Sequence, residues 1–174
     1  MDLPRIQIPV FVSCPSNLNA KQQESAALIH QELKKNKLEW RALGRNEYPD
    51  ELPLREVLRM VKHCSGGVIL GFEQFHAPNG GTFKRGSAKQ SKTANPVFMP
   101  TPWNQLEAGI LFNQELPMLI FKEDGIEGGV FDVGTSEVFI HKMPTKGMAK
   151  SSRESVAMVF QKWTAKVYKH YYGE

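Results

Sequence analysis

The chain has 174 residues and a formal net charge of +4, and 41% of its residues are hydrophobic. This length and apolar content suit one domain, residues 1–174, with a proper core. Because it lacks an apolar run of about 18 residues and a recognisable signal peptide, the composition predicts a cytoplasmic protein without a membrane partner.

The cysteines and histidines argue against a disulfide framework and a metal centre. Cys14 and Cys64 stand beside apolar runs, which is typical of small buried side chains. The five histidines include no pair at ligand spacing, so no metal site is predicted. Glycine-rich dinucleotide motifs, the Walker A lysine motif and the G-x-S-x-G elbow are also missing, so the sequence predicts no bound cofactor.

The first part of the chain alternates strand and helix patterns. Residues 6–14 are rich in β-branched side chains and predict a buried strand. Asn19 is placed to cap a helix that begins at Ala20. The same criteria predict, in order, a strand at 38–43, a helix at 54–61 and a wholly apolar strand at 66–72.

A long segment, residues 73–100, follows and is expected to be an irregular insertion loop. A loop of this length indicates a lid, a specificity element or an assembly surface. It holds four basic residues and one acid, so the rest of the chain is close to neutral. Such a stripe suits phosphate on a nucleotide or on nucleic acid, or it keeps a loop solvated. Since no nucleic-acid motif accompanies it, the sequence argues against nucleic acid as a partner.

A helix is predicted next, with Thr101 as N-cap and Pro102 as its first residue. Its apolar face is expected to hold Trp103, Leu106, Ile110 and Leu111. Glu107 falls at the border of this face, four residues after Trp103, so both project from one side. A carboxylate there is partly desolvated, which raises its pKa or requires a partner. The alternative is an acid that the helix dipole stabilises.

Two further strands and a closing helix complete the pattern. The strands are predicted at 117–121 and 137–141, and the helix at 151–173 opens with a capping box of Ser151 and Glu154. Alternation of short strands and helices is typical of a mainly parallel five-stranded sheet covered on both faces. The sequence therefore predicts an α/β, flavodoxin-like or Rossmann-like, three-layer sandwich.

Ligands of such folds bind beyond the carboxyl ends of the strands, where the strand order reverses. The segments that leave the first three predicted strands should therefore meet in one crevice. The candidate substrate-binding residues on these segments are Ser13, Ser16, Asn17, Arg45, Tyr48, Asp50 and Trp103. The hydroxyls, backbone amides and guanidinium among them suit phosphate, whereas plain loop roles are the alternative.

The stretch "TPWNQLEAG" resembles the Ser-x-Trp-Cys-x-x-Glu segment of Toll/interleukin-1 receptor (TIR) domains, with Thr101, Trp103, Asn104 and Glu107 at the four positions. "PVFVSCPSN" and "LPLREVLRMVKHCSGGVILGF" are similar to the first TIR strand and to a later helix–strand segment. The three blocks occur in the TIR order over residues 6–121. Asn104 replaces the family's cysteine, and the preceding loop is longer than in TIR domains. The chain is also similar to the related nucleoside 2-deoxyribosyltransferases.

The TIR resemblance implies an N-glycosidase that cleaves the nicotinamide–ribose bond of NAD, as a hydrolase or a cyclase, with Glu107 as the catalytic residue. NAD would be substrate rather than cofactor, and the chain would form a homo-oligomer and act in bacterial defence signalling. One alternative is a nucleoside or nucleotide N-glycosidase or 2-deoxyribosyltransferase, which would also use Glu107. The other is a non-catalytic TIR-like nucleotide-sensing or adaptor module.

Overall fold

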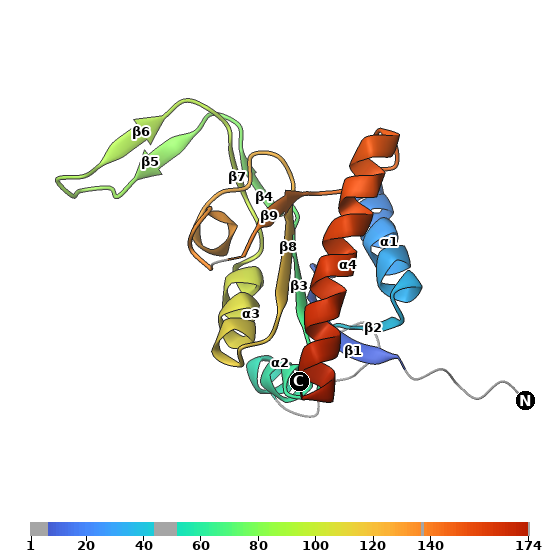
Figure 1. Ribbon diagram of the computed structural model, residues 1–174. Helices are drawn as coiled ribbons and strands as arrows, with labels where there is room; N and C mark the ends of the chain where they lie inside the picture. Colours follow the sequence, from blue (N-terminus) through green and yellow to red (C-terminus); the bar gives the residue numbers. More distant parts are fainter. Residues whose placement is uncertain (1–6, 44–51, 137, 174) are drawn as a thin grey trace, which may run out of the picture.

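A five-stranded sheet forms the centre of the molecule (Figure 1). The structure, a computed structural model, describes residues 7–43, 52–136 and 138–173. The strand order is β2-β1-β3-β8-β9, and every neighbouring pair is parallel. The strands are β1 Ile8–Ser13, β2 Leu38–Arg41, β3 Gly67–Gly71, β8 Met118–Lys122 and β9 Ile140–Lys142. This order, with helices on both faces, is that of flavodoxin-like α/β proteins, so the predicted fold class is confirmed.

Two pairs of helices cover the two faces of the sheet. Helices α1 (Ala20–Lys35) and α4 (Lys150–Tyr172) lie on one face, and α2 (Pro53–Val61) and α3 (Pro102–Asn113) lie on the other (Figure 1). Side chains of β1 alternate between the two cores, as the two-residue period of a strand requires. Val10 and Val12 belong to the α1/α4 core, whereas Phe11 belongs to the α2/α3 core. Ser13 therefore leaves the strand on the α2/α3 side.

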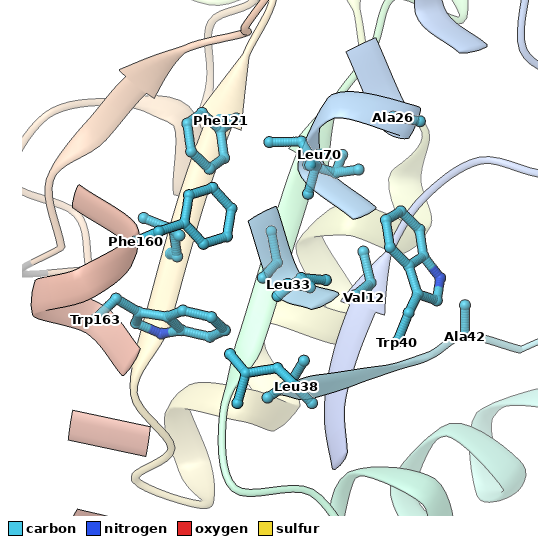
Figure 2. Packing of buried hydrophobic residues seen from close by; sticks show 14 of the residues in the cluster. Val12, Ala26, Leu33, Leu38, Trp40, Ala42, Leu70, Phe121, Phe160 and Trp163 are labelled. Carbon is cyan, nitrogen blue, oxygen red and sulfur yellow. The ribbon is translucent and has the colours of Figure 1, made fainter. Parts of the chain in front are cut away.

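The core under α1 and α4 is built from aliphatic and aromatic side chains of distant segments. Leu33 of α1 lies near Val12 of β1 (Figure 2). Phe160 of α4 stacks on Phe121, and Trp163 packs edge-on against Phe160 on its other side (Figure 2). All of these residues are buried. Burial of a large apolar side chain contributes about 1.5–3 kcal/mol, so this layer is a main source of stability.

The predicted cap of α1 is confirmed. The Gln22 amide donates to the Asn19 Oδ1 atom at 2.9 Å, and the Asn19 amide donates to Gln22 Oε1 at 3.2 Å. This reciprocal pair satisfies two of the backbone donors that a helix start leaves without intrahelical partners. The Gln22 side chain also donates to the Glu123 carboxylate at 3.0 Å, so the start of α1 is bonded to the segment after β8.

The expectation of an irregular loop at residues 73–100 is wrong. The segment forms two antiparallel ribbons, named the β-arm here (residues 74–100). Its strands are β4 Phe75–Ala77, which pairs with β7 Val97–Met99, and β5 Gly81–Phe83, which pairs with β6 Ser91–Thr93. The outer ribbon projects well beyond the body of the molecule (Figure 1). The strand pattern escaped sequence analysis because each strand has only three residues and most of them are exposed.

The start of the closing helix also differs from the prediction. Helix α4 begins at Lys150 with Ala149 as N-cap, and no side chain caps it. Ser151 therefore lies inside the first turn, and the predicted capping box does not form. The fifth strand, predicted at 137–141, is β9 at Ile140–Lys142, and Glu137 lies outside the described residues.

Candidate functional site

The reversal of strand order lies between β1 and β3. The chain leaves β1 through α1 to reach β2 on one side, whereas β3 pairs with the other side of β1. The connections that follow β1 and β3 run to opposite sides of the sheet. Open α/β sheets bind ligands outside the carboxyl ends of two strands whose connections diverge in this way. Helix α3 begins at this edge of the sheet and packs on β1 and β3 (Figure 1).

Helix α3 turns a partly polar face towards the sheet. Its buried residues are Asn104, Glu107, Ala108 and Leu111. The predicted apolar face is wrong for Trp103 and Leu106, which are 39% and 49% exposed, and right for Leu111, which is buried. Ile110, its fourth predicted member, is partly buried against the same core. Gly67 on β3 explains the rotation: the Leu111 side chain occupies the space that a Cβ at this position would need. With Leu111 held there, Asn104 and Glu107 must face the sheet on the preceding two turns.

The two buried polar residues of α3 meet the last residue of β1. Asn104 Nδ2 donates to Ser13 Oγ at 2.7 Å and lies 3.4 Å from the Leu70 carbonyl oxygen of β3. Since Asn104 donates this hydrogen bond and the Ser13 oxygen accepts it, the Ser13 hydroxyl can donate its own hydrogen to another acceptor. That acceptor is the Glu107 carboxyl group, to which Ser13 is hydrogen-bonded.

Burial raises the pKa of Glu107 to about 7. The cause is desolvation, because a carboxylate in this position loses most of its hydration. The hydrogen bond from Ser13 acts in the opposite direction and lowers the pKa. Among the described residues, no cation forms an ion pair with Glu107. The Glu107 carboxyl group therefore exchanges its proton near neutral pH, as the groups that act in general acid–base catalysis do.

Asn104 is the site residue that sequence analysis missed. Its side chain is fully buried, and its Oδ1 atom has no hydrogen-bond partner in the described part of the chain. A buried acceptor without a partner costs about 1–3 kcal/mol, a cost that the fold bears at this position. The spacing held the clue, because Asn104 lies three residues before Glu107 and shares its face of the helix.

The structure brings only some of the predicted residues together. Ser13 joins Glu107, as expected. Trp103 lies one turn before Glu107, on the exposed side of α3. Ser16 and Asn17 are exposed in the segment between β1 and α1. The other predicted residues, Arg45, Tyr48 and Asp50, lie outside the described residues.

Two hollows lie at a different part of the sheet. The larger, about 480 Å³, is bordered by β9 and α4 and is lined by His141 and Met143. The smaller, about 180 Å³, is lined by Lys122 and Glu123 at the end of β8. Glu107 lines neither of them. Within residues 7–43, 52–136 and 138–173, no three His, Cys, Asp or Glu side chains are grouped to hold a metal ion. No described helix is long and apolar enough to span a membrane.

Comparison with known proteins finds similarity at the level of structure alone. Neither a protein-family model nor a curated protein sequence matches the chain. A conserved protein from Enterococcus faecalis V583 superposes with a TM-score of 0.49 at 9% identity, over 90% of this chain and 98% of that one. A diflavin flavoprotein A3 from Nostoc sp. gives 0.48 at 12% identity, over 98% of this chain and 99% of that one. Constitutive lysine decarboxylase of E. coli gives 0.47 at 11% identity, over 92% of this chain and 18% of that one. These distant likenesses carry no argument about reaction or ligand.

Proposed function

We propose that the chain is a TIR-like N-glycosidase that cleaves the nicotinamide–ribose bond of NAD with Glu107 as its catalytic residue. The observation that carries the proposal is the position of Glu107, which is 8% exposed, lacks an ion-pair partner among the described residues and lies at the reversal of strand order. A carboxylate that no protein cation neutralises is suited to stabilise a positive charge on a substrate.

The reaction needs a negative charge more than it needs an acid. The nitrogen of bound nicotinamide is positively charged, so it leaves as a neutral base when the C–N bond breaks and takes the bonding electrons. The ribose is left with oxocarbenium character, and a nearby carboxylate lowers the energy of that charge. Water then adds to the anomeric carbon and loses a proton, or a second nucleophile on the substrate closes a ring. Glu107 in its ionised form supplies the carboxylate.

Ser13 and Asn104 act as positioning residues in this scheme. The chain of hydrogen bonds from Asn104 through Ser13 sets the rotamer of the Glu107 side chain and keeps its pKa from rising further. Asn104 is held in turn by the backbone of β3, since its amide nitrogen lies 3.4 Å from the Leu70 carbonyl oxygen. Ser16 and Asn17 remain candidates for the phosphates.

The exposed face of α3 supports self-association as part of the proposal. Trp103, Leu106 and Phe112 are large apolar side chains that are 39%, 49% and 59% exposed. Exposed apolar side chains gathered on one helix favour a protein contact, and the TIR resemblance implies a second copy of this chain as the partner. Activity that rises faster than protein concentration, together with a mass above 19.7 kDa in light scattering, is the expected result. A Leu106→Glu variant should lose both the concentration dependence of its activity and the higher mass.

The test is release of nicotinamide from NAD, followed by chromatography over a range of protein concentrations. Glu107→Gln should lower the rate by about 100-fold or more, because the replacement keeps size and hydrogen bonding but removes the charge. The matched control is Glu56→Gln. Glu56 is also a buried helix carboxylate on this side of the sheet, but it is paired with Arg59 at 2.7 Å, and its variant should retain the parental rate.

The pKa of about 7 favours one alternative enough to test it alongside. Near neutral pH about half of the Glu107 side chains carry a proton, and a protonated carboxyl can assist a neutral base that leaves a nucleoside. A panel of nucleosides and deoxynucleosides therefore accompanies NAD. Release of another base that is lost in Glu107→Gln would make the chain a nucleoside glycosidase or deoxyribosyltransferase. Nucleotide binding without turnover at any protein concentration would point to a sensing module. Turnover of NAD by Glu107→Gln at the parental rate would refute the proposal.

A further inference from the structure

The outer ribbon of the β-arm carries the whole net charge of the protein. Lys84, Arg85, Lys89 and Lys92 lie on or between β5 and β6, and all four are exposed. No Asp or Glu occurs between residues 74 and 106. Four of the 22 basic residues are thus on the outer ribbon, and the remaining 18 are matched by 18 acidic residues elsewhere in the chain. The molecule is a neutral body with a positive arm.

The four cations are available to a partner. Among the described residues, none of them takes part in an ion pair. The backbone at the tip is turned by Lys84 and Gly86, which have φ values of 51° and 78°, and Gln90 accepts from the Gly86 amide at 2.8 Å. The positive charges are therefore presented on a folded turn and a two-stranded ribbon.

The base of the arm is fixed to the body. The Phe98 ring of β7 stacks on His76 of β4 with 4.7 Å between ring centres. Phe98 also forms a β-bridge to Ile126, and a Cβ at Gly125 would come within 2.6 Å of its ring. The Gln74 amide donates to the Met99 carbonyl oxygen at 2.9 Å. These contacts set the direction in which the arm leaves the sheet (Figure 1).

We propose that the β-arm binds duplex DNA, with its four cations on the phosphates and the outer ribbon lying along a groove. Charge favours DNA over a second copy of the chain as the partner, because the body of a second copy has no net negative charge to attract the arm. Shape favours it as well, since the major groove of DNA admits a two-stranded β-ribbon. Phe83, which is 43% exposed on β5, adds an apolar contact beside the cations. Sequence analysis argued against nucleic acid because no nucleic-acid motif accompanies the basic residues, and the two-stranded ribbon that carries them is the new argument for it.

Binding of this kind is independent of base sequence and sensitive to salt. Each phosphate that a cation neutralises releases counterions, so the logarithm of the binding constant falls with the logarithm of salt concentration by about 0.9 per phosphate. Four arm cations predict a slope of about −3 to −4. Dissociation constants for non-specific binding are on the order of 10⁻⁴ to 10⁻⁶ M at physiological salt, so the interaction should be measured at low salt.

The experiment uses the full chain and a fluorescent 20-base-pair duplex, with anisotropy recorded from about 25 to 200 mM NaCl. In the arm variant, Lys84, Arg85, Lys89 and Lys92 are all replaced by Gln. The control changes the net charge by the same amount, because four exposed lysines of the body are replaced by Gln instead. These are Lys34, Lys62, Lys162 and Lys166. The arm variant should lose at least about tenfold in affinity at 50 mM salt, and most of the slope, whereas the control should stay within about threefold of the parent.

Several results would overturn the proposal. Equal losses in the two variants would mean that only net charge matters, and unchanged binding by the arm variant would exclude the arm. A parent that binds anionic phospholipid vesicles but not the duplex would assign the arm to a membrane surface. If the parent does not bind DNA but forms oligomers, and the arm variant forms none, the partner of the arm would be a second copy of the chain. Glu107→Gln should bind DNA like the parent, so this test is independent of the proposed enzyme activity.

Discussion

Two buried carboxylates on the same side of the sheet behave as opposites. Glu56, in the first turn of α2, is 3% exposed and lies 2.7 Å from the Arg59 guanidinium one turn later. Glu107, in the middle of α3, is 8% exposed, and within the described part of the chain it is bonded to a hydroxyl group and forms no ion pair. Both are helix residues that a sequence pattern would treat alike.

The two carboxylates differ in the interactions that replace their lost hydration. Glu56 is paired with a guanidinium and lies in the first turn of its helix, near the positive end of the helix dipole. Glu107 has one hydrogen bond from Ser13, and desolvation outweighs it, so its pKa rises to about 7. A fold gains nothing from a carboxylate held in this way. Such a cost is typical of a functional group, and it makes Glu107 the centre of the proposed site.

The largest expected effect is on the pH dependence of NAD cleavage. If the ionised form of Glu107 stabilises the transition state, kcat/KM falls about tenfold for each pH unit below about 7 and levels off above it. From the plateau near pH 9 to pH 5 the loss is about 100-fold. Initial rates from pH 5 to 9 measure this. A profile that is flat across this range would contradict the role assigned to Glu107.

The next effect is on stability, and the sign follows from the raised pKa. Glu107 keeps its proton in the folded state up to about pH 7 but loses it near 4.5 when unfolded. Its contribution is therefore fully present below about pH 4.5 and is lost as pH rises to about 7. The loss is about 3 kcal/mol, since each tenfold change in proton affinity is worth about 1.4 kcal/mol. Urea unfolding at pH 5 and pH 8 should show about 2.5 kcal/mol of this loss in the parent and none of it in Glu107→Gln.

Ser13→Ala should move the pH profile rather than abolish activity. The variant removes the hydrogen bond that lowers the pKa of Glu107, so the midpoint of the rate profile should shift above about 7. It also leaves Asn104 Nδ2 without its 2.7 Å partner, which should cost about 1 kcal/mol of stability. The exposed Ser16→Ala is the control and should change neither quantity. A midpoint that stays in place would remove Ser13 from the site.

The smallest effect is expected at Glu56. Replacement by Gln removes a charge-assisted bond to an Arg59 side chain that is 61% exposed, so the stability should fall by about 1 kcal/mol or less. The rate of NAD cleavage should not change. Unfolding curves and initial rates at pH 8 test both statements. Loss of activity here would show that the two carboxylates do not differ in the way proposed.

The elements that sequence analysis predicted correctly share a strong local signal. The wholly apolar run at β3 and the paired Asn19 and Gln22 at the start of α1 depend on neighbours within a few residues. The β-arm had no such signal, because its strands have three residues each and most of their side chains are exposed, and the strands of its inner ribbon pair over 20 to 24 residues. The face of α3 was misjudged for a similar reason. Leu111 fits against Gly67, and this contact between distant residues, rather than the apolar pattern, sets the rotation of the helix.

By itself, the sequence determined the order of the five sheet strands and of the helices that cover them, the caps of α1 and α3, and the place of Glu107 as a candidate site residue. These follow from side-chain periodicity and from short-range hydrogen bonds. Only the tertiary structure decided that Asn104 and Ser13 reach Glu107 and that the basic residues stand on a ribbon away from a neutral body. The pKa of a carboxyl group depends on how much water its surroundings exclude. Those surroundings come from β1, β3 and α3, which only the folded chain brings together.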